Sequence, residues 1–154
     1  VEFEALLAYS WVLQPTGSPM RDVIERFVVK ANGPQALARS LSGGNLQKYI
    51  VGREVMRHPK VLVVAQPTWG VDVGAAAQIR AELVALRDAG CALLVISEEL
   101  DELFEISDRL MVIAKGRLSP SIASSDASID LIGQWMSGMW SNTVVTPLRE
   151  VVYA

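Results

Sequence analysis

The sequence predicts an α/β domain built around a parallel sheet. Two short runs rich in valine, leucine and isoleucine, Lys60 to Ala65 and Ala92 to Ser97, have the length and composition of fully buried strands. The segment between them, Val73 to Ala89, repeats apolar residues with helical spacing. A strand, a helix and a second strand in this order form a right-handed crossover in a parallel sheet. Ligands of such sheets bind at the carboxyl ends of the strands, where Gln66 and Glu98 fall.

The composition is that of a globular protein with a core of its own. The 154 residues suit one domain, and 51% of them are hydrophobic and 20% charged. A formal net charge of −3, with no stripe of lysine and arginine, gives no electrostatic reason to expect nucleic acid as a partner. Apolar runs such as Ala5 to Leu13 are too short to span a bilayer, so we expect a soluble, cytoplasmic chain. Cys91 lies in an apolar run and is expected to be a buried structural thiol.

The crossover helix has local signals at both of its ends. Asp72 is suited to cap the N-terminus, and Gly90 is suited to end the helix. The apolar face that we expect to pack on the sheet consists of Ala76, Ile79, Leu83 and Leu86.

The remaining elements follow from periodicity and turn residues. An amphipathic pattern over Met20 to Val29 predicts a short helix, followed by a turn at Asn32-Gly33-Pro34. Beyond the second strand we expect helices at Glu99 to Ile106 and Ser128 to Met139, with strands at Arg109 to Ala114 and Arg117 to Leu118 between them.

The most distinctive local pattern is a serine and two glycines at the start of a helix. A segment of helical periodicity runs from Gly44 to about Arg57, and Ser42, Gly43 and Gly44 are expected at its N-terminus. Unpaired N–H groups, the positive end of the helix dipole and the Ser42 hydroxyl would suit a phosphate there. A second interpretation is an ordinary capped helix, in which Ser42 satisfies its own backbone.

Three stretches in unbroken order resemble one known family. They are LSGGNLQK, Leu41 to Lys48, then PTWGVDVGA, and then ISEELDELFEISDRLMVIAKGRL. The first resembles the signature motif of ATP-binding cassettes, and all three together resemble the cassettes of simple-sugar and nucleoside importers. The resemblance extends from Phe27 to Gly138. A chance match of an unrelated α/β domain would require several motifs to coincide in order, so we set that interpretation aside.

The resemblance implies a fold and a set of segments. The fold is a parallel-sheet P-loop NTPase, here a fragment that lacks the P-loop strand and keeps part of the helical subdomain. The segments are a remnant of that subdomain and what precedes it (1–40), the signature helix and α/β core (41–120), a C-terminal helix (121–139) and a tail (140–154). The phosphate-binding loop GxxxxGK[ST] of the family does not occur in this sequence.

The residues that would perform chemistry in the family are replaced in this chain. Where the family has an aspartate for magnesium and then a glutamate for the attacking water, the sequence has Ala65 and Gln66. Where the family often has a histidine, it has Glu98. Alanine offers no oxygen to a metal, and glutamine cannot accept a proton at neutral pH. We therefore expect a degenerate site with no metal ligands, and a chain that is inactive as an ATPase when alone.

The intact signature motif implies a role on a partner cassette. In the family two cassettes meet head to tail, and each ATP lies between the P-loop of one and the signature of the other. Ser42, Gly43, Gly44 and Asn45 would then contact ATP phosphates in trans, and Asp72 would lie in the loop between the two sites. ATP and Mg²⁺ are expected only in the assembled complex. The alternative is a non-catalytic docking module that never contacts nucleotide.

The resemblance also implies partners and a location. The partners are a second ATP-binding cassette and the transmembrane permease subunits, at the inner face of the cell membrane. Without a neighbouring P-loop strand, the strand at Ala92 to Ser97 would expose an unpaired edge. We therefore expect the isolated chain to self-associate, to swap a segment, or to cover that edge with its N-terminal or C-terminal apolar stretch.

Overall fold

The computed structural model describes residues 20–32 and 36–140. These residues form two compact units that divide between Ile96 and Ser97, and each unit is described by itself. The expectations for the N-terminal segment, for Gly33-Pro34 and for the tail from residue 141 lie outside the described residues. The four-segment division made from the sequence stays a prediction.

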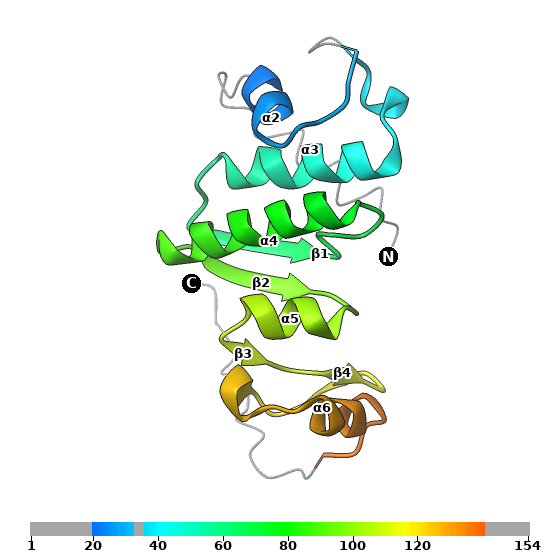
Figure 1. Cartoon of the computed structure of the whole chain (residues 1–154). Coiled ribbons are helices and arrows are strands. Elements are labelled where there is room, and N and C mark those ends of the chain that lie inside the picture. Colours follow the sequence, from blue (N-terminus) through cyan, green and yellow to red (C-terminus); the bar gives the residue numbers. More distant parts are fainter. Residues whose placement is uncertain (1–19, 33–35, 141–154) are drawn as a thin grey trace, which may run out of the picture. The chain divides into compact units, whose positions relative to one another are not determined.

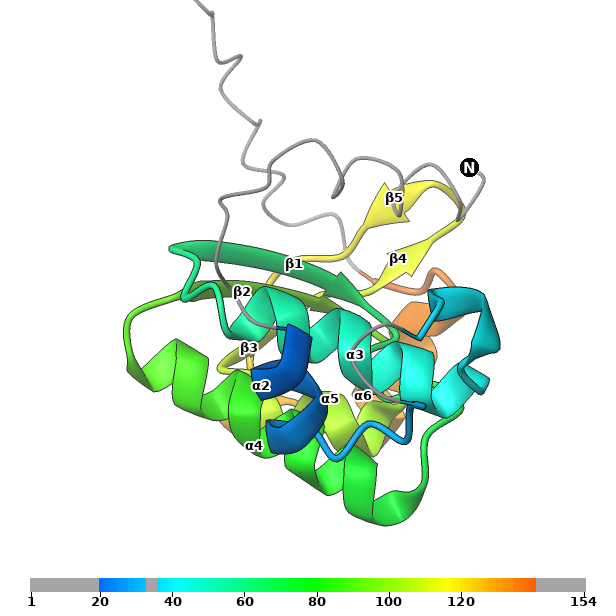
Figure 2. The ribbon, with the colours of Figure 1, turned by 90° about the horizontal axis from the view of Figure 1, so that it is seen from above.

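The first unit is a parallel pair of strands with helices against it (Figures 1 and 2). The strands pair in register from Val61 with Ala92 to Ala65 with Ile96, which confirms the predicted parallel crossover. The elements in chain order are α2 (Met20–Arg26), the 3-10 turn η1 (Ala38–Ser40), α3 (Gly43–Val55), β1 (Val61–Ala65), α4 (Val73–Asp88) and β2 (Ala92–Ile96).

The core of the first unit lies where the three helices meet. Figure 2 shows α3 and α4 on the same side of the strands, and α2 packs on α3. Phe27, Ile79 and Leu83 are fully buried. Gly52 of α3 makes room for the Phe27 ring, because a Cβ at position 52 would lie 2.5 Å from a ring carbon. The close approach of α2 to α3 therefore depends on the absence of a side chain there.

The helix ends follow local signals at some positions and not at others. The Asp72 carboxylate accepts the Ala75 N–H at 2.9 Å, and Gly90 follows α4 with φ +96, so both predicted ends are confirmed. Helix α3 ends at Val55, two residues before the predicted Arg57. His58 has φ +48 and therefore lies outside the helical region, so the chain has left the helix before Pro59.

The prediction that both strands are fully buried was wrong. On one face of the pair, Val61, Val63, Leu94 and Ile96 are 66%, 60%, 48% and 50% exposed. The alternate residues, which point toward the helices, are half-buried. The physical reason is that the described helices cover one face of the pair, and an apolar run does not reveal how many of its faces are covered.

In its described residues, 97–140, the second unit contains short strands and the helices α5 and α6. Its elements are α5 (Leu100–Ile106), β3 (Arg109–Leu110), β4 (Ile113–Ala114), β5 (Arg117–Leu118), β6 (Ile122–Ala123), the 3-10 turn η2 (Ser124–Asp126) and α6 (Ile129–Met136). The predicted strand over Arg109 to Ala114 is divided, because β3 pairs with β6 whereas β4 pairs with β5. Val112 lies at the change of partner and exchanges hydrogen bonds with Ser119, at 2.8 and 2.9 Å.

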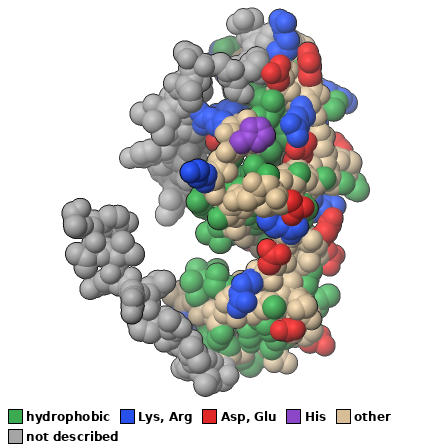
Figure 3. Space-filling model, turned by 90° about the vertical axis from the view of Figure 1, so that its left-hand side faces the viewer, with side chains coloured by type: hydrophobic (Ala, Val, Ile, Leu, Met, Phe, Trp, Pro, Cys, Tyr) green, Lys and Arg blue, Asp and Glu red, His purple; other side chains and the backbone are tan. Residues whose placement is uncertain are grey.

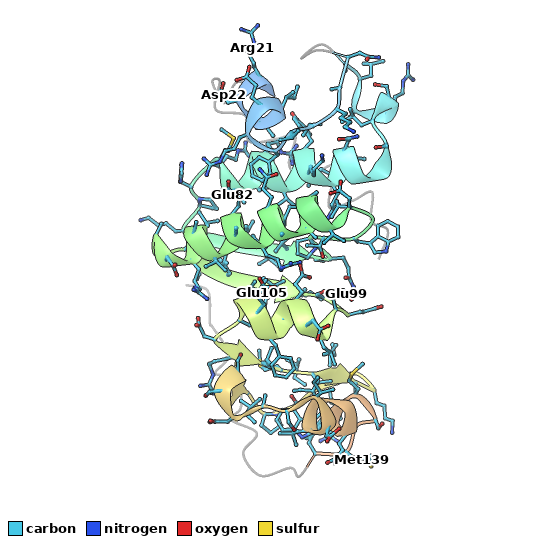
Figure 4. The ribbon with its side chains drawn as sticks, viewed as in Figure 1. Arg21, Asp22, Glu82, Glu99, Glu105 and Met139 are labelled. Atoms are coloured by element: carbon cyan, nitrogen blue, oxygen red, sulfur yellow. The ribbon has the colours of Figure 1, made fainter. Side chains whose placement is uncertain are left out.

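Charged side chains lie mainly on the surface of the helices. Figure 3 shows the single histidine, His58, exposed beside lysine and arginine side chains. In Figure 4, Arg21 and Asp22 extend from α2 away from α3. Glu82 of α4 accepts two hydrogen bonds from Arg26, at 2.9 and 2.6 Å. No helix within the described residues is long and apolar enough to cross a membrane.

Candidate functional site

The first turn of α3 presents an unusual serine. Ser42 occupies the N-cap position, but its side chain accepts no hydrogen bond from the helix backbone. Its Oγ instead accepts a hydrogen bond from the Asn45 side-chain Nδ2 at 2.9 Å, and the Asn45 side-chain Oδ1 accepts one from the Lys30 N–H at 2.8 Å. The interpretation of Ser42 as a self-satisfied cap is therefore wrong. Because the Ser42 oxygen is the acceptor in this bond, its hydroxyl hydrogen is left available to donate to a ligand.

Backbone donors surround this hydroxyl. Within residues 20–32 and 36–140, the N–H groups of Gly43, Gly44 and Asn45 have no acceptor, and the first helical bond is from Leu46 N–H to the Ser42 carbonyl at 2.9 Å. Ser42 and Gly43 are exposed. Three N–H groups and one hydroxyl at the positive end of a helix are a suitable arrangement for an anion.

The loop from Gln66 to Asp72, here called the β1–α4 loop, lies against this turn. A Cβ at Gly44 would be only 2.7 Å from the Gly70 carbonyl oxygen and 3.5 Å from the Val71 Cα. A side chain at position 44 would therefore push the loop away from the helix. The two glycines of the motif thus differ, because a Cβ at Gly43 meets nothing within 4 Å.

Asp72 lies at the far end of the β1–α4 loop and caps α4. The backbone N–H of Ala75 holds the pKa of its carboxyl below the usual value of 3.8. Partial desolvation opposes that shift, and the positive charge of Lys48 supports it. The side chain is exposed, so the carboxylate is both charged at neutral pH and accessible.

The replaced positions lie at the ends of the two strands. Ala65 is the last residue of β1, and Gln66 follows it with φ +49 while its N–H continues the ladder to the Ile96 carbonyl at 2.7 Å. Glu98 is exposed and belongs to the second unit. Among the residues that the structure describes, no group of three or more histidine, cysteine, aspartate or glutamate side chains could hold a metal ion.

Two residues at the end of the signature motif make contacts that the sequence did not predict. The Gln47 side-chain amide donates to the carbonyls of Gln66 and Pro67, at 2.8 and 3.1 Å. Lys48 is only 8% exposed, and its ammonium donates to the Val28 carbonyl at 2.8 Å, just after α2. Their positions within the motif were the available signal, because all three acceptors are backbone carbonyls that lie 19 or 20 residues away in the sequence.

Buried Glu102 was also missed. It is 4% exposed, and its carboxylate accepts the Ser97 hydroxyl at 2.9 Å, while the Ser97 oxygen accepts the Glu99 N–H at 3.1 Å. This arrangement fixes the start of α5 next to Glu98. The available signal was a glutamate five residues after Ser97 in an otherwise amphipathic helix.

The amino-acid sequence is similar to those of known import ATP-binding proteins. The chain is 44% identical over 121 residues to the nucleoside import ATP-binding protein NupA of Lactococcus lactis, a match that covers 79% of this chain and 24% of the relative. It is 39% identical over 120 residues to a ribose import ATP-binding protein of Rhizobium etli, a match that covers 78% of this chain and 24% of that relative. The chain is homologous to import ATP-binding proteins. It spans about a quarter of the length of these curated relatives, and no family model matches it.

Solved structures agree on the fold of the cassette. The ATP-binding subunit of an ABC transporter superposes with a TM-score of 0.68 at 15% identity, over 86% of this chain and 60% of that one. A dimeric ATP-binding cassette bound to ADP and Pi superposes with a TM-score of 0.61 at 15% identity, over 77% of this chain and 53% of that one. The predicted fold class, part of a P-loop NTPase cassette, is thereby confirmed.

Proposed function

We propose that this cassette serves an importer of a sugar or nucleoside, and that the N-terminus of α3 binds the phosphates of an ATP held by a partner cassette. The observation that carries the proposal is the Ser42 hydroxyl beside the amides of Gly43, Gly44 and Asn45, none of which has an acceptor among the described residues. Such donors act by position and electrostatics and transfer no proton, so they function equally well on a ligand held by another chain.

The relatives and one structural neighbour support the biological setting. The relatives are named as import ATP-binding proteins for a nucleoside and for ribose. The neighbour is a dimeric cassette bound to ADP and Pi. The partners in this proposal are a second cassette and a membrane permease, and the location is the cytoplasmic face of the membrane.

The chain's own nucleotide site is proposed to be degenerate. Ala65 has no side-chain oxygen at the end of β1, Gln66 carries no carboxylate, and Glu98 brings a negative charge that repels phosphate. These residues do not fit a bound Mg²⁺, so no catalytic step is assigned to them. ATP and Mg²⁺ belong to this proposal only in the assembled complex, where the partner cassette holds them.

The decisive experiment is a titration of a P-loop-bearing partner cassette with this chain while the steady-state ATPase rate is followed. We expect a saturable rise. The Ser42→Glu variant should lower the plateau about 100-fold, because it replaces a phosphate donor with a repelling carboxylate. Ser125→Glu is the matched control, since it adds the same charge at an exposed serine in η2 and should leave the rise unchanged. A Ser42→Glu variant as active as the parent chain would refute the proposal.

The second candidate is a docking module that never contacts nucleotide. It is favoured by the replacements at Ala65, Gln66 and Glu98. Amide hydrogen exchange separates the two candidates, because vanadate-trapped nucleotide in the assembled pair should protect Gly43 and Gly44 only if phosphate lies on them. A flat ATPase titration with binding shown independently would favour the docking module.

A further inference from the structure

The contact between Gln47 and the β1–α4 loop has a consequence for the candidate site. Gln47 is half-buried, and its side-chain amide nitrogen donates to two backbone carbonyls, those of Gln66 at 2.8 Å and Pro67 at 3.1 Å. The Pro67 side chain is fully buried. A single side chain of α3 thus holds two successive peptide groups at the point where the loop leaves β1.

The peptide that Gln47 holds is in an unfavourable conformation. Gln66 has φ +49, in the left-handed region that residues with a Cβ adopt at a cost. Its N–H is bonded to the Ile96 carbonyl at 2.7 Å, and its own carbonyl also accepts the Trp69 N–H at 3.2 Å. The Gln47 donor therefore contributes to keeping the chain turned at Gln66, and this turn sets the direction of the whole loop.

The same loop touches the phosphate-binding turn itself. The Gly70 carbonyl oxygen lies so close to Gly44 that a Cβ at position 44 would not fit, and the Val71 Cα is in van der Waals contact with the same position. The loop then ends at Asp72, which caps α4. A displacement of α3 relative to the loop is consequently restrained at two places, by Gln47 through hydrogen bonds and by Gly44 through direct packing.

We propose that Gln47 is a positioning residue that locks the β1–α4 loop to α3, so that the amides of Gly43 and Gly44 and the carboxylate of Asp72 move as one body. The consequence for ATP in a partner cassette rests on the proposed function. The attachment of the β1–α4 loop to α3 by Gln47 is a property of this chain alone and is tested separately.

The first measurement is amide hydrogen exchange on the full chain. In Gln47→Leu, which keeps the bulk and removes the donor, the Trp69 and Val71 amides should exchange at least about 5-fold faster. A change of about 5-fold is expected for the loss of one hydrogen bond, and this variant loses both carbonyl contacts of the Gln47 amide. The matched control is Gln78→Leu, because the Gln78 side-chain amide likewise donates to a backbone carbonyl in this unit, that of Arg26 at 2.6 Å, but not to the β1–α4 loop. The control should leave Trp69 and Val71 unchanged. Equal exchange at these amides in the parent chain and in Gln47→Leu would overturn the proposal that Gln47 holds the β1–α4 loop to α3.

A second variant keeps the test decisive if Gln47→Leu does not fold. Gln47→Glu has nearly the same shape but directs a carboxylate at two carbonyl oxygens, so it should release the loop at least as much. In the ATPase titration, either variant should lower the plateau while leaving the half-saturating concentration of the chain unchanged. A changed half-saturation with an unchanged plateau would contradict a positioning role. If the parent chain itself gave no rise in the ATPase rate, the proposed function would fail. Hydrogen exchange would still show whether Gln47 holds the loop to α3.

Discussion

At the scale of single residues, Asp72 has two distinguishable roles. It caps α4 through the Ala75 N–H, and it ends the loop that touches the candidate phosphate site. The hydrogen bond lowers its pKa in the folded chain, so the stabilisation is fully present above the usual value of 3.8. It is lost as the pH falls through the lower folded pKa, because the protonated carboxyl is a poorer acceptor.

We predict that Asp72→Ala lowers the urea midpoint of unfolding at pH 7, because the first turn of α4 loses its cap. The difference from the parent chain should shrink as the pH falls below 3.8, where the parent carboxylate becomes protonated. Urea unfolding at several pH values measures this. Asp88→Ala is a suitable control, since Asp88 is exposed and lies at the C-terminal end of the same helix. A difference that grew toward acid pH would contradict the assignment.

At the scale of secondary structure elements, the packing of α2 on α3 depends on Gly52. The Phe27 ring fills the space where a Cβ would be, and the ring is fully buried. The ring cannot move away freely, because protein interiors are close-packed. An added methyl group would therefore displace Phe27 or separate the helices.

We predict that Gly52→Ala destabilises the chain by about 1–3 kcal/mol through overpacking, although alanine is the better helix former. Gly133→Ala in α6 is the matched control, since a Cβ there meets nothing within 4 Å and should stabilise by up to about 1 kcal/mol. Chemical denaturation measures both changes. Equal effects of the two substitutions would show that α2 does not pack on Gly52 as described.

At the scale of the whole molecule, exposed apolar side chains are the feature that most affects behaviour in solution. On the β1–β2 pair, Val61, Val63, Leu94 and Ile96 share one face and are between 48% and 66% exposed. In the second unit Ile113 and Leu118, which are cross-strand partners, are 73% and 59% exposed. Contiguous apolar surface of this kind favours association.

We predict that the isolated chain self-associates or covers this surface with one of its terminal apolar stretches. Sedimentation velocity should show a concentration-dependent species larger than the 16.8 kDa monomer. The double variant Val63→Glu and Leu94→Glu should reduce association, because it places two charges on the exposed strand face. Leu37→Glu is the control, since Leu37 is also exposed, at 59%, but lies outside the strands. A monodisperse monomer with disordered termini would contradict the prediction.

Much of the architecture followed from local sequence signals. The parallel crossover, the Asp72 cap, the Gly90 stop and the short helices were predicted because they depend on residues adjacent in the chain. The order of the three motifs was sufficient for the family, since each motif is continuous. The replacements at Ala65 and Gln66 can likewise be read directly from the sequence.

Only the tertiary structure decided what the side chains of the signature helix contact. Gln47 and Lys48 bind backbone carbonyls brought close by folding, and a backbone carbonyl carries no residue-specific signal in the sequence. The difference between Gly43 and Gly44 likewise depends on where Gly70 lies. The exposure of one strand face has the same cause, because hydrophobicity shows that a residue favours burial, whereas neighbouring elements determine whether it is buried.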